Sequence, residues 1–252
     1  MTDQSQRGLV RVEPCARRVR AFLHGACVLD TIRAVYVWEL PYYPAYYVPV
    51  DDVVATLVPT GDTEHSPSRG DADIYDVEVA SGVRASAAAK RYAESPIHAL
   101  RGLVHVQWPL MDEWFEEDEP VYTHPRDPYT RVDVLASSRR VRVELDGVTL
   151  ADTAAVHVLF ETGLPPRFYL PMTDVRMDLL EPSPSESHCP YKGQASYWSV
   201  VVDGARHDDF AWCYRAPFPE SQKIAGMVCF YNEKVDLYLD GVAQPRPLTH
   251  FS

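Results

Sequence analysis

The chain contains two similar copies of one sequence in tandem, each of about 110 residues. Val19 in the first copy recurs as Val141 in the second, 122 positions further on. The spacing increases to 123 where His65 recurs as His188, and to 124 near the end of each copy. A tandem duplication restricts the fold strongly, because each copy must bury its own core and both copies must adopt the same architecture.

The repeat divides the sequence into four segments. Residues 1–16 precede the first copy and are expected to form an N-terminal arm. The first repeat spans residues 17–123 and the second spans residues 139–252. Residues 124–138 are rich in Pro, Asp, Arg and Ser, which is typical of an exposed linker between domains.

Short apolar runs with alternating polarity indicate β-structure. Residues 141–145 alternate apolar and polar side chains, and the Asp146-Gly147 pair that follows is a strong signal for a two-residue hairpin turn. Short helical turns are expected at most, one of them at residues 219–225. The predicted fold is all-β, with two tandem homologous, compact antiparallel domains. Further strands are predicted at residues 148–150, 156–161, 167–170, 175–180, 195–202 and 227–231.

Charge and hydropathy limit the partners. The chain has 36 acidic and 24 basic residues, a formal charge of −12, which would repel the phosphate backbone of a nucleic acid. No apolar run approaches the roughly 18 residues that span a bilayer, and the polar N-terminus lacks the apolar core of a signal peptide. We therefore expect a cytoplasmic protein, a monomer or homodimer, that binds a small molecule and neither nucleic acid nor membrane.

Cysteine usage argues against a structural metal site. The five cysteines are odd in number and include no CxxC pair, so neither a disulfide framework nor a zinc site is expected. No metal and no cofactor is predicted.

The loop at residues 188–193 is the main functional candidate. It reads HCPYKG, whereas the corresponding residues 65–70 read HSPSRG. Basic neighbours favour a thiolate, so Cys189 is a candidate nucleophile with His188 and Lys192 as catalytic partners. Alternatively, these two basic residues bind a carboxylate or phosphate, or the segment is a structural turn beneath which Cys189 fills space.

Other residues of the two copies could line a ligand pocket. Glu39 and Glu161 each end an apolar strand in equivalent positions, and a carboxylate buried there would need a basic partner or a ligand. Aromatic residues near the ends of strands would supply apolar walls. The remaining candidates are Tyr47, Tyr169, Arg176, Tyr191, Tyr197, Trp198 and Trp212.

The motifs resemble one known family. The HCPYKG loop, the segment Ala195-Ser196-Tyr197-Trp198-Ser199 and the segment Ile224-Ala225-Gly226 are similar to bacterial domain-of-unknown-function family 427, labelled nucleotidyltransferase-like. The resemblance covers almost the whole chain from Arg17. It implies β-tent-like domains, often duplicated in actinobacterial members, and it implies no assigned activity.

The residues themselves argue against metal-dependent nucleotidyl transfer. That chemistry needs a Gly-Ser turn followed by spaced carboxylates that hold two metal ions. Asp71 and Asp73 are suitably spaced, but no Gly-Ser pair precedes them. Two function classes remain: a small-molecule enzyme, such as a tailoring or cyclising enzyme, with an apolar, aromatic-lined pocket in or between the domains, and a non-catalytic ligand-binding or interaction module. In either case the principal site is expected in residues 139–252.

Overall fold

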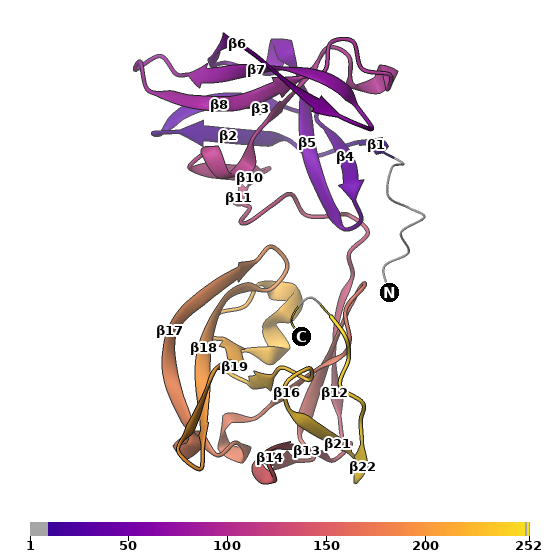
Figure 1. The fold of residues 1–252 in the computed structure, drawn as a ribbon, viewed down its shortest axis with the longest axis vertical. Coiled ribbons are helices and arrows are strands. Elements are labelled where there is room, and N and C mark those ends of the chain that lie inside the picture. The colour runs from indigo at the N-terminus through magenta and orange to yellow at the C-terminus, as the bar shows by residue number, and fades with distance from the viewer. Residues whose placement is uncertain (1–9, 250, 252) are drawn as a thin grey trace. The chain divides into compact units, whose positions relative to one another are not determined.

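The computed structural model describes residues 10–249 and residue 251, and the chain divides after Tyr129 into two compact units. Each unit is built from antiparallel strands and short 3-10 turns (Figure 1). The all-β fold class and the tandem arrangement predicted from the sequence are therefore confirmed. The N-terminal arm predicted for residues 1–16 lies partly outside the described residues, and Arg11–Pro14 form a strand.

Within the described residues, the first unit contains eleven strands. They are β1 (Arg11–Pro14), β2 (Val19–Leu23), β3 (Ala26–Thr31), β4 (Val35–Leu40), β5 (Tyr43–Pro49), β6 (Thr56–Ser66), β7 (Gly70–Glu78), β8 (Arg84–Arg91), β9 (Leu103–Val106), β10 (Glu113–Glu116) and β11 (Glu119–Pro120). The 3-10 turns are η2 (Val50–Asp52), η3 (His98–Leu100) and η4 (Trp108–Leu110).

The described part of the second unit also contains eleven strands. They are β12 (Val132–Ser137), β13 (Val141–Leu145), β14 (Val148–Thr153), β15 (Val156–Glu161), β16 (Arg167–Leu170), β17 (Leu180–Cys189), β18 (Gly193–Val202), β19 (Ala205–Tyr214), β20 (Val228–Phe230), β21 (Asp236–Leu239) and β22 (Val242–Ala243). The 3-10 turns are η5 (Met172–Asp174), η6 (Met177–Leu179) and η7 (Pro219–Ile224).

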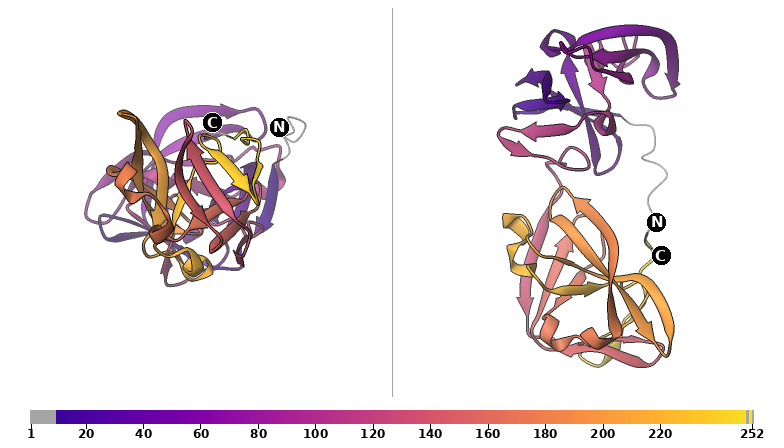
Figure 2. Two further views of the ribbon diagram at one scale, coloured as in Figure 1. Left: turned by 90° about the horizontal axis from the view of Figure 1, so that it is seen from below. Right: turned by 90° about the vertical axis from the view of Figure 1, so that its left-hand side faces the viewer.

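The two units share one topology. Each has a seven-stranded sheet, in the order β1-β4-β5-β9-β8-β7-β6 or β12-β15-β16-β20-β19-β18-β17, and a four-stranded sheet. The long hairpins of β17, β18 and β19 curve along one side of the second unit (Figures 1 and 2). Register shifts also recur: Trp198/Val200 in the second unit matches Tyr75/Val77 in the first. Because a slip of one residue would turn every side chain to the opposite face, the length differences between the copies fall in the turns.

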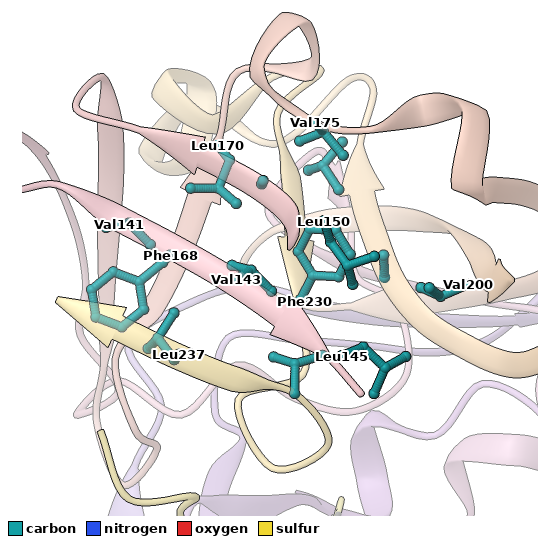
Figure 3. Packing of buried hydrophobic residues seen from close by; sticks show 14 of the residues in the cluster. Val141, Val143, Leu145, Leu150, Phe168, Leu170, Val175, Val200, Phe230 and Leu237 are labelled. Atoms are coloured by element: carbon teal, nitrogen blue, oxygen red, sulfur yellow. The ribbon is translucent and has the colours of Figure 1, made fainter. Parts of the chain in front are cut away.

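The main core of each unit lies between its two sheets. In the second unit, alternate residues of β13 face inward, and Val141, Val143 and Leu145 pack with Phe168 and Leu237 (Figure 3). All five side chains are buried, and fully burying an aliphatic or aromatic side chain contributes about 1.5–3 kcal/mol. The polarity alternation seen in the sequence thus corresponds to an inner and an outer face.

The opposite face of each large sheet carries a second, smaller cluster. In the second unit this outer-face cluster is formed by strands from across the sheet and by Ile224 of η7. Its buried members are Val134, Leu159, Tyr169, Ala195, Trp212, Tyr214, Ile224 and Cys229. The first unit has an equivalent cluster of Val37, Tyr47, Ala72, Tyr92 and Leu100.

Two segments differ from the sequence-based expectation. Residues 175–180 were expected to form a strand, but η6 occupies residues 177–179 and β17 begins only at Leu180. The backbone turns there because two amides donate hydrogen bonds: that of Arg176 to Leu150 O at 2.8 Å, and that of Leu179 to Arg176 O at 2.9 Å. Residues 132–137, within the segment expected to be a linker, form β12, which pairs with β15 along its whole length.

The outermost strands β6 and β17 end the large sheets. Pro59 lies in β6, and Pro182 and Pro184 lie in β17, where a missing amide hydrogen is tolerated because no strand of the described residues pairs with the outer edge. Most residues of both strands are exposed.

Gly193, at the start of β18, has a backbone conformation that few other residues adopt. Its φ is +97°, and an added Cβ would meet Ala216 O at 3.5 Å and Pro217 Cα at 3.7 Å. We expect Gly193→Ala to lower the free energy of unfolding by about 1–2 kcal/mol, measured by urea denaturation. Gly204→Ala is the control: its φ is +79° and nothing lies within 4 Å of an added Cβ. The contacts at Gly193 are ordinary van der Waals distances, so the two variants should have similar costs. A much larger cost for Gly193→Ala would show that the contacts, and not the backbone conformation, determine the loss.

Candidate functional site

The centre of the candidate site is a buried ion pair on the outer face of the second unit. Lys192 Nζ donates a hydrogen bond to Glu161 Oε2, and the two side chains are only 9% and 10% exposed. Glu161 is the last residue of β15, and Lys192 lies in the turn between β17 and β18. The expectation that Glu161 would need a basic partner on burial is thus met by a residue 31 positions away.

Tyrosine and tryptophan side chains form the rest of this face. Tyr169 accepts a hydrogen bond from Trp212 Nε1 at 3.2 Å, and their rings meet edge to face. Burial raises the pKa of both Tyr169 and Tyr214 well above the usual range, so both phenols stay protonated. Tyr197 packs against the same cluster, and its hydroxyl lies 2.7 Å from Ser187 Oγ. The face therefore combines flat apolar rings with neutral hydroxyl groups.

The three residues considered for thiol catalysis lie close in sequence but have different environments. Cys189 is half-buried and packs against the outer-face cluster, whereas His188, one residue earlier on β17, is exposed. Alternation along the strand turns their side chains to opposite faces. Lys192 is bound to Glu161, so its ammonium already has an anionic partner. Tyr191, in the intervening turn, is half-buried.

Two other candidates lie away from this cluster. Trp198 is buried in the core between the sheets, because it follows Tyr197 and points to the other side of β18. Arg176 is exposed and forms an ion pair with Asp178, with its Nη2 at 2.6 Å from Asp178 Oδ2. The structure thus brings Glu161, Tyr169, Tyr197, Lys192 and Trp212 to one face but not these two.

The segment that contains η7 covers the turn bearing Lys192. The Phe218 amide donates to Lys192 O at 3.1 Å, and the Lys223 ammonium donates to Val134 O at 3.2 Å. Between them, Ser221 is fully buried, and its hydroxyl has no hydrogen-bond partner among the described residues. Ile224, one helical turn further on, belongs to the outer-face cluster. A buried hydroxyl without a partner carries a desolvation penalty, which a bound molecule could relieve.

A second buried ion pair in this unit was missed by sequence reasoning. Arg167 donates two hydrogen bonds to Glu233, at 2.6 and 2.8 Å, and the side chains are 6% and 0% exposed. Burial alone would raise the pKa of Glu233, but the hydrogen bonds from Arg167 and Thr249 outweigh it and hold this pKa below its usual value. Arg167 lies 5.6–5.7 Å from the ring centroids of Trp212, Tyr231 and Phe251. No local pattern reveals this pair, because its partners are 66 residues apart.

The first unit has the same glutamate and tyrosines at the equivalent positions but an arginine in place of the lysine. Arg69 occupies the place of Lys192 and binds Glu39 at 2.6 Å, with the side chains 11% and 36% exposed. Arg69 Nη1 also donates to the Tyr47 hydroxyl at 2.6 Å, and its guanidinium lies 4.6 Å from the Tyr92 ring centroid. By strand register, Tyr92 matches Tyr214. The basic–acidic pair is thus present in both copies, but its surroundings differ.

The described residues contain no candidate metal site. No group of three or more His, Cys, Asp or Glu side chains placed to hold a metal ion occurs among them. Likewise, no helix in the described part of the chain is long and apolar enough to cross a membrane.

These features define a duplicated all-β protein in which each large sheet carries a basic–acidic pair on its outer face. Residues 11–117 and residues 133–241 each match the NTP_transf_9 family model, described as a domain of unknown function (DUF427). The chain therefore belongs to this family, as a tandem-duplicated member. The two matches begin 122 positions apart and end 124 apart, the same drift as in the internal repeat. No curated protein matches the chain.

Proposed function

We propose that the second unit binds a small, uncharged hydroxylated aromatic molecule on its outer face. The observation that carries this proposal is the buried Lys192–Glu161 pair beside the tyrosine-rich cluster. The flat rings of the outer-face cluster would contact the ligand's ring, and the ion pair would bind the ligand's hydroxyl group.

The energetics of a buried ion pair support a functional role. Desolvating two charges offsets most of their attraction, so a well-packed apolar pair is often at least as stable. The first copy keeps a basic–acidic pair at the same place, where Arg69 replaces Lys192, and the neighbouring Tyr47 and Tyr92 match Tyr169 and Tyr214. The presence of the pair and of these tyrosines in both copies supports a role in binding.

The pair also indicates the chemistry of the ligand. After binding Glu161, the Lys192 ammonium has two further hydrogens to donate, and Glu161 retains acceptor capacity. A hydroxyl group can accept from the ammonium and donate to the carboxylate at once. Because the two charges compensate each other, an uncharged ligand is favoured over an ion.

Binding of naphthol to the full chain tests this proposal. Calorimetry should show that Lys192→Met weakens naphthol binding by about 10–100-fold, because a charge-assisted hydrogen bond is lost. Removing both charges in Lys192→Met/Glu161→Leu should leave the protein folded and likewise abolish tight binding. Arg176→Gln, which breaks the exposed Arg176–Asp178 pair of the same unit, is the matched control and should bind normally.

Cys189→Ala separates binding from thiol chemistry. Cys189 packs against the cluster, so this change should alter naphthol affinity only a few-fold, in line with lost contact area. Unchanged affinity in Lys192→Met would refute the proposed site, whereas complete loss in Cys189→Ala alone would favour a role for the thiol.

A further inference from the structure

We propose that the first unit holds a second binding site, for a planar uncharged amide, formed by Arg69, Tyr47, Tyr92, His105 and Glu39. It does not depend on the site proposed for the second unit, because it uses other residues and selects another ligand chemistry.

Two tyrosine hydroxyls supply hydrogen-bond donors. Tyr92 is 1% exposed, and its hydroxyl is buried without a hydrogen-bond partner in the part of the chain that the structure describes. The Tyr47 hydroxyl accepts from Arg69 Nη1 at 2.6 Å, which leaves its own hydrogen available. The two rings are neighbours, with centroids 6.4 Å apart. A carbonyl oxygen is the acceptor that would satisfy both donors, and a buried hydroxyl left unpaired is costly.

Acceptors for an N–H group are present as well. His105 Nδ1 lies 3.0 Å from Tyr46 O and must donate to that carbonyl, so the lone pair of the neutral ring is on Nε2. Burial, together with the nearby Arg69 and Lys90, lowers the pKa of His105 to about 4, which keeps the ring neutral. Glu39, 36% exposed, is the most accessible member and offers a carboxylate at the solvent side.

The charge of the site fits a neutral group, and flat rings line it. The Tyr47 and His105 rings stack at 5.0 Å with planes 20° apart, and Arg69 lies over the ring of Tyr92 at 4.6 Å. The cations are already neutralised, because Arg69 pairs with Glu39 and Lys90 pairs with Glu64 at 2.8 Å. A carboxylate would add an uncompensated charge, whereas an amide supplies a carbonyl and an N–H without one.

The second unit keeps the two tyrosines but lacks the other groups. By strand register, Tyr169 and Tyr214 match Tyr47 and Tyr92. Trp212 stands where the first unit has Lys90 and donates to Tyr169, and Cys229 stands at the position of His105. The histidine acceptor and the guanidinium that donates to Tyr47 are thus specific to the first unit.

Titration of the full chain with benzamide, followed by protein NMR, tests the inference. Benzamide is expected to bind with a dissociation constant in the millimolar range, as a small fragment does, and to shift resonances of the first unit. Tyr92→Phe should weaken binding about tenfold, because the carbonyl loses a buried donor. The same variant should raise the melting temperature of the free protein, because it removes an unpaired buried hydroxyl. Tyr214→Phe, the equivalent change in the second unit, is the matched control and should leave benzamide binding unchanged.

Four results would overturn the inference. They are absence of benzamide binding up to about 10 mM, equal affinity in Tyr92→Phe, a lower melting temperature in that variant, and benzoate binding as tightly as benzamide. None of them bears on naphthol binding to the second unit, so the two proposals fail separately.

Discussion

Glu233→Gln is expected to lower the free energy of unfolding of the second unit by about 3–5 kcal/mol. Arg167 is 6% exposed and has Glu233 as its bidentate partner, so the substitution leaves a buried guanidinium without a compensating charge. The three aromatic rings around Arg167 offer cation–π contacts but no acceptor of comparable strength. Hydrogen exchange followed by mass spectrometry would report the loss in the second unit alone.

The double variant Arg167→Met/Glu233→Leu tests the cause. If the penalty arises from an unpaired charge, replacing both partners with apolar residues should restore most of the stability. Asp178→Asn, which breaks the exposed pair with Arg176, provides the control and should leave the free energy of unfolding nearly unchanged. A double variant as unstable as Glu233→Gln would show that geometry, rather than charge, determines the loss.

The first unit should lose stability as the pH falls from 6.5 to about 4, because of His105. Burial, with Arg69 and Lys90 nearby, lowers the pKa of His105 from 6.5 to about 4, so the unfolded chain takes up a proton that the folded chain resists. The stability that depends on a neutral His105 is fully present above pH 6.5 and is lost progressively as the pH falls below this value. By pH 4 the loss should reach about 3 kcal/mol.

His105→Gln isolates this contribution from the carboxylates that titrate in the same range. The amide can still donate to Tyr46 O but does not gain a proton, so the variant should show a flatter dependence of stability on pH. Urea denaturation at several pH values would give both curves. Parallel curves for the variant and the unchanged protein would mean that His105 keeps an ordinary pKa in the folded state.

The strands could be predicted where the sequence pattern has one interpretation. Residues 141–145 alternate strictly and precede an Asp-Gly turn, and β13 occupies them. Residues 175–179 alternate as strictly, but no Asp-Gly turn follows them, and η6 forms at residues 177–179. Strand β12 was missed because its residues follow a Pro- and Asp-rich segment and its pairing partner, β15, lies some twenty residues downstream.

Contacts between distant residues account for the part of the candidate site that the sequence did not indicate. Glu161 was singled out as needing a partner, but nothing local identified Lys192 rather than Arg167 as that partner. Only the folded structure determines that Lys192 pairs with Glu161 and that Arg167 pairs with Glu233. The unpaired hydroxyls of Tyr92 and Ser221 likewise depend on burial and on the distances to all possible acceptors. Such features follow from packing, not from residue type.

The prolines in the outermost strands have a consequence for how the protein behaves at high concentration. An unpaired strand edge presents alternating amide and carbonyl groups on which a neighbouring molecule could add a strand. Pro59, Pro182 and Pro184 remove amide hydrogens along β6 and β17, so an incoming strand would find an incomplete set of partners. The chain can therefore present two wide sheets while discouraging their growth into fibrils.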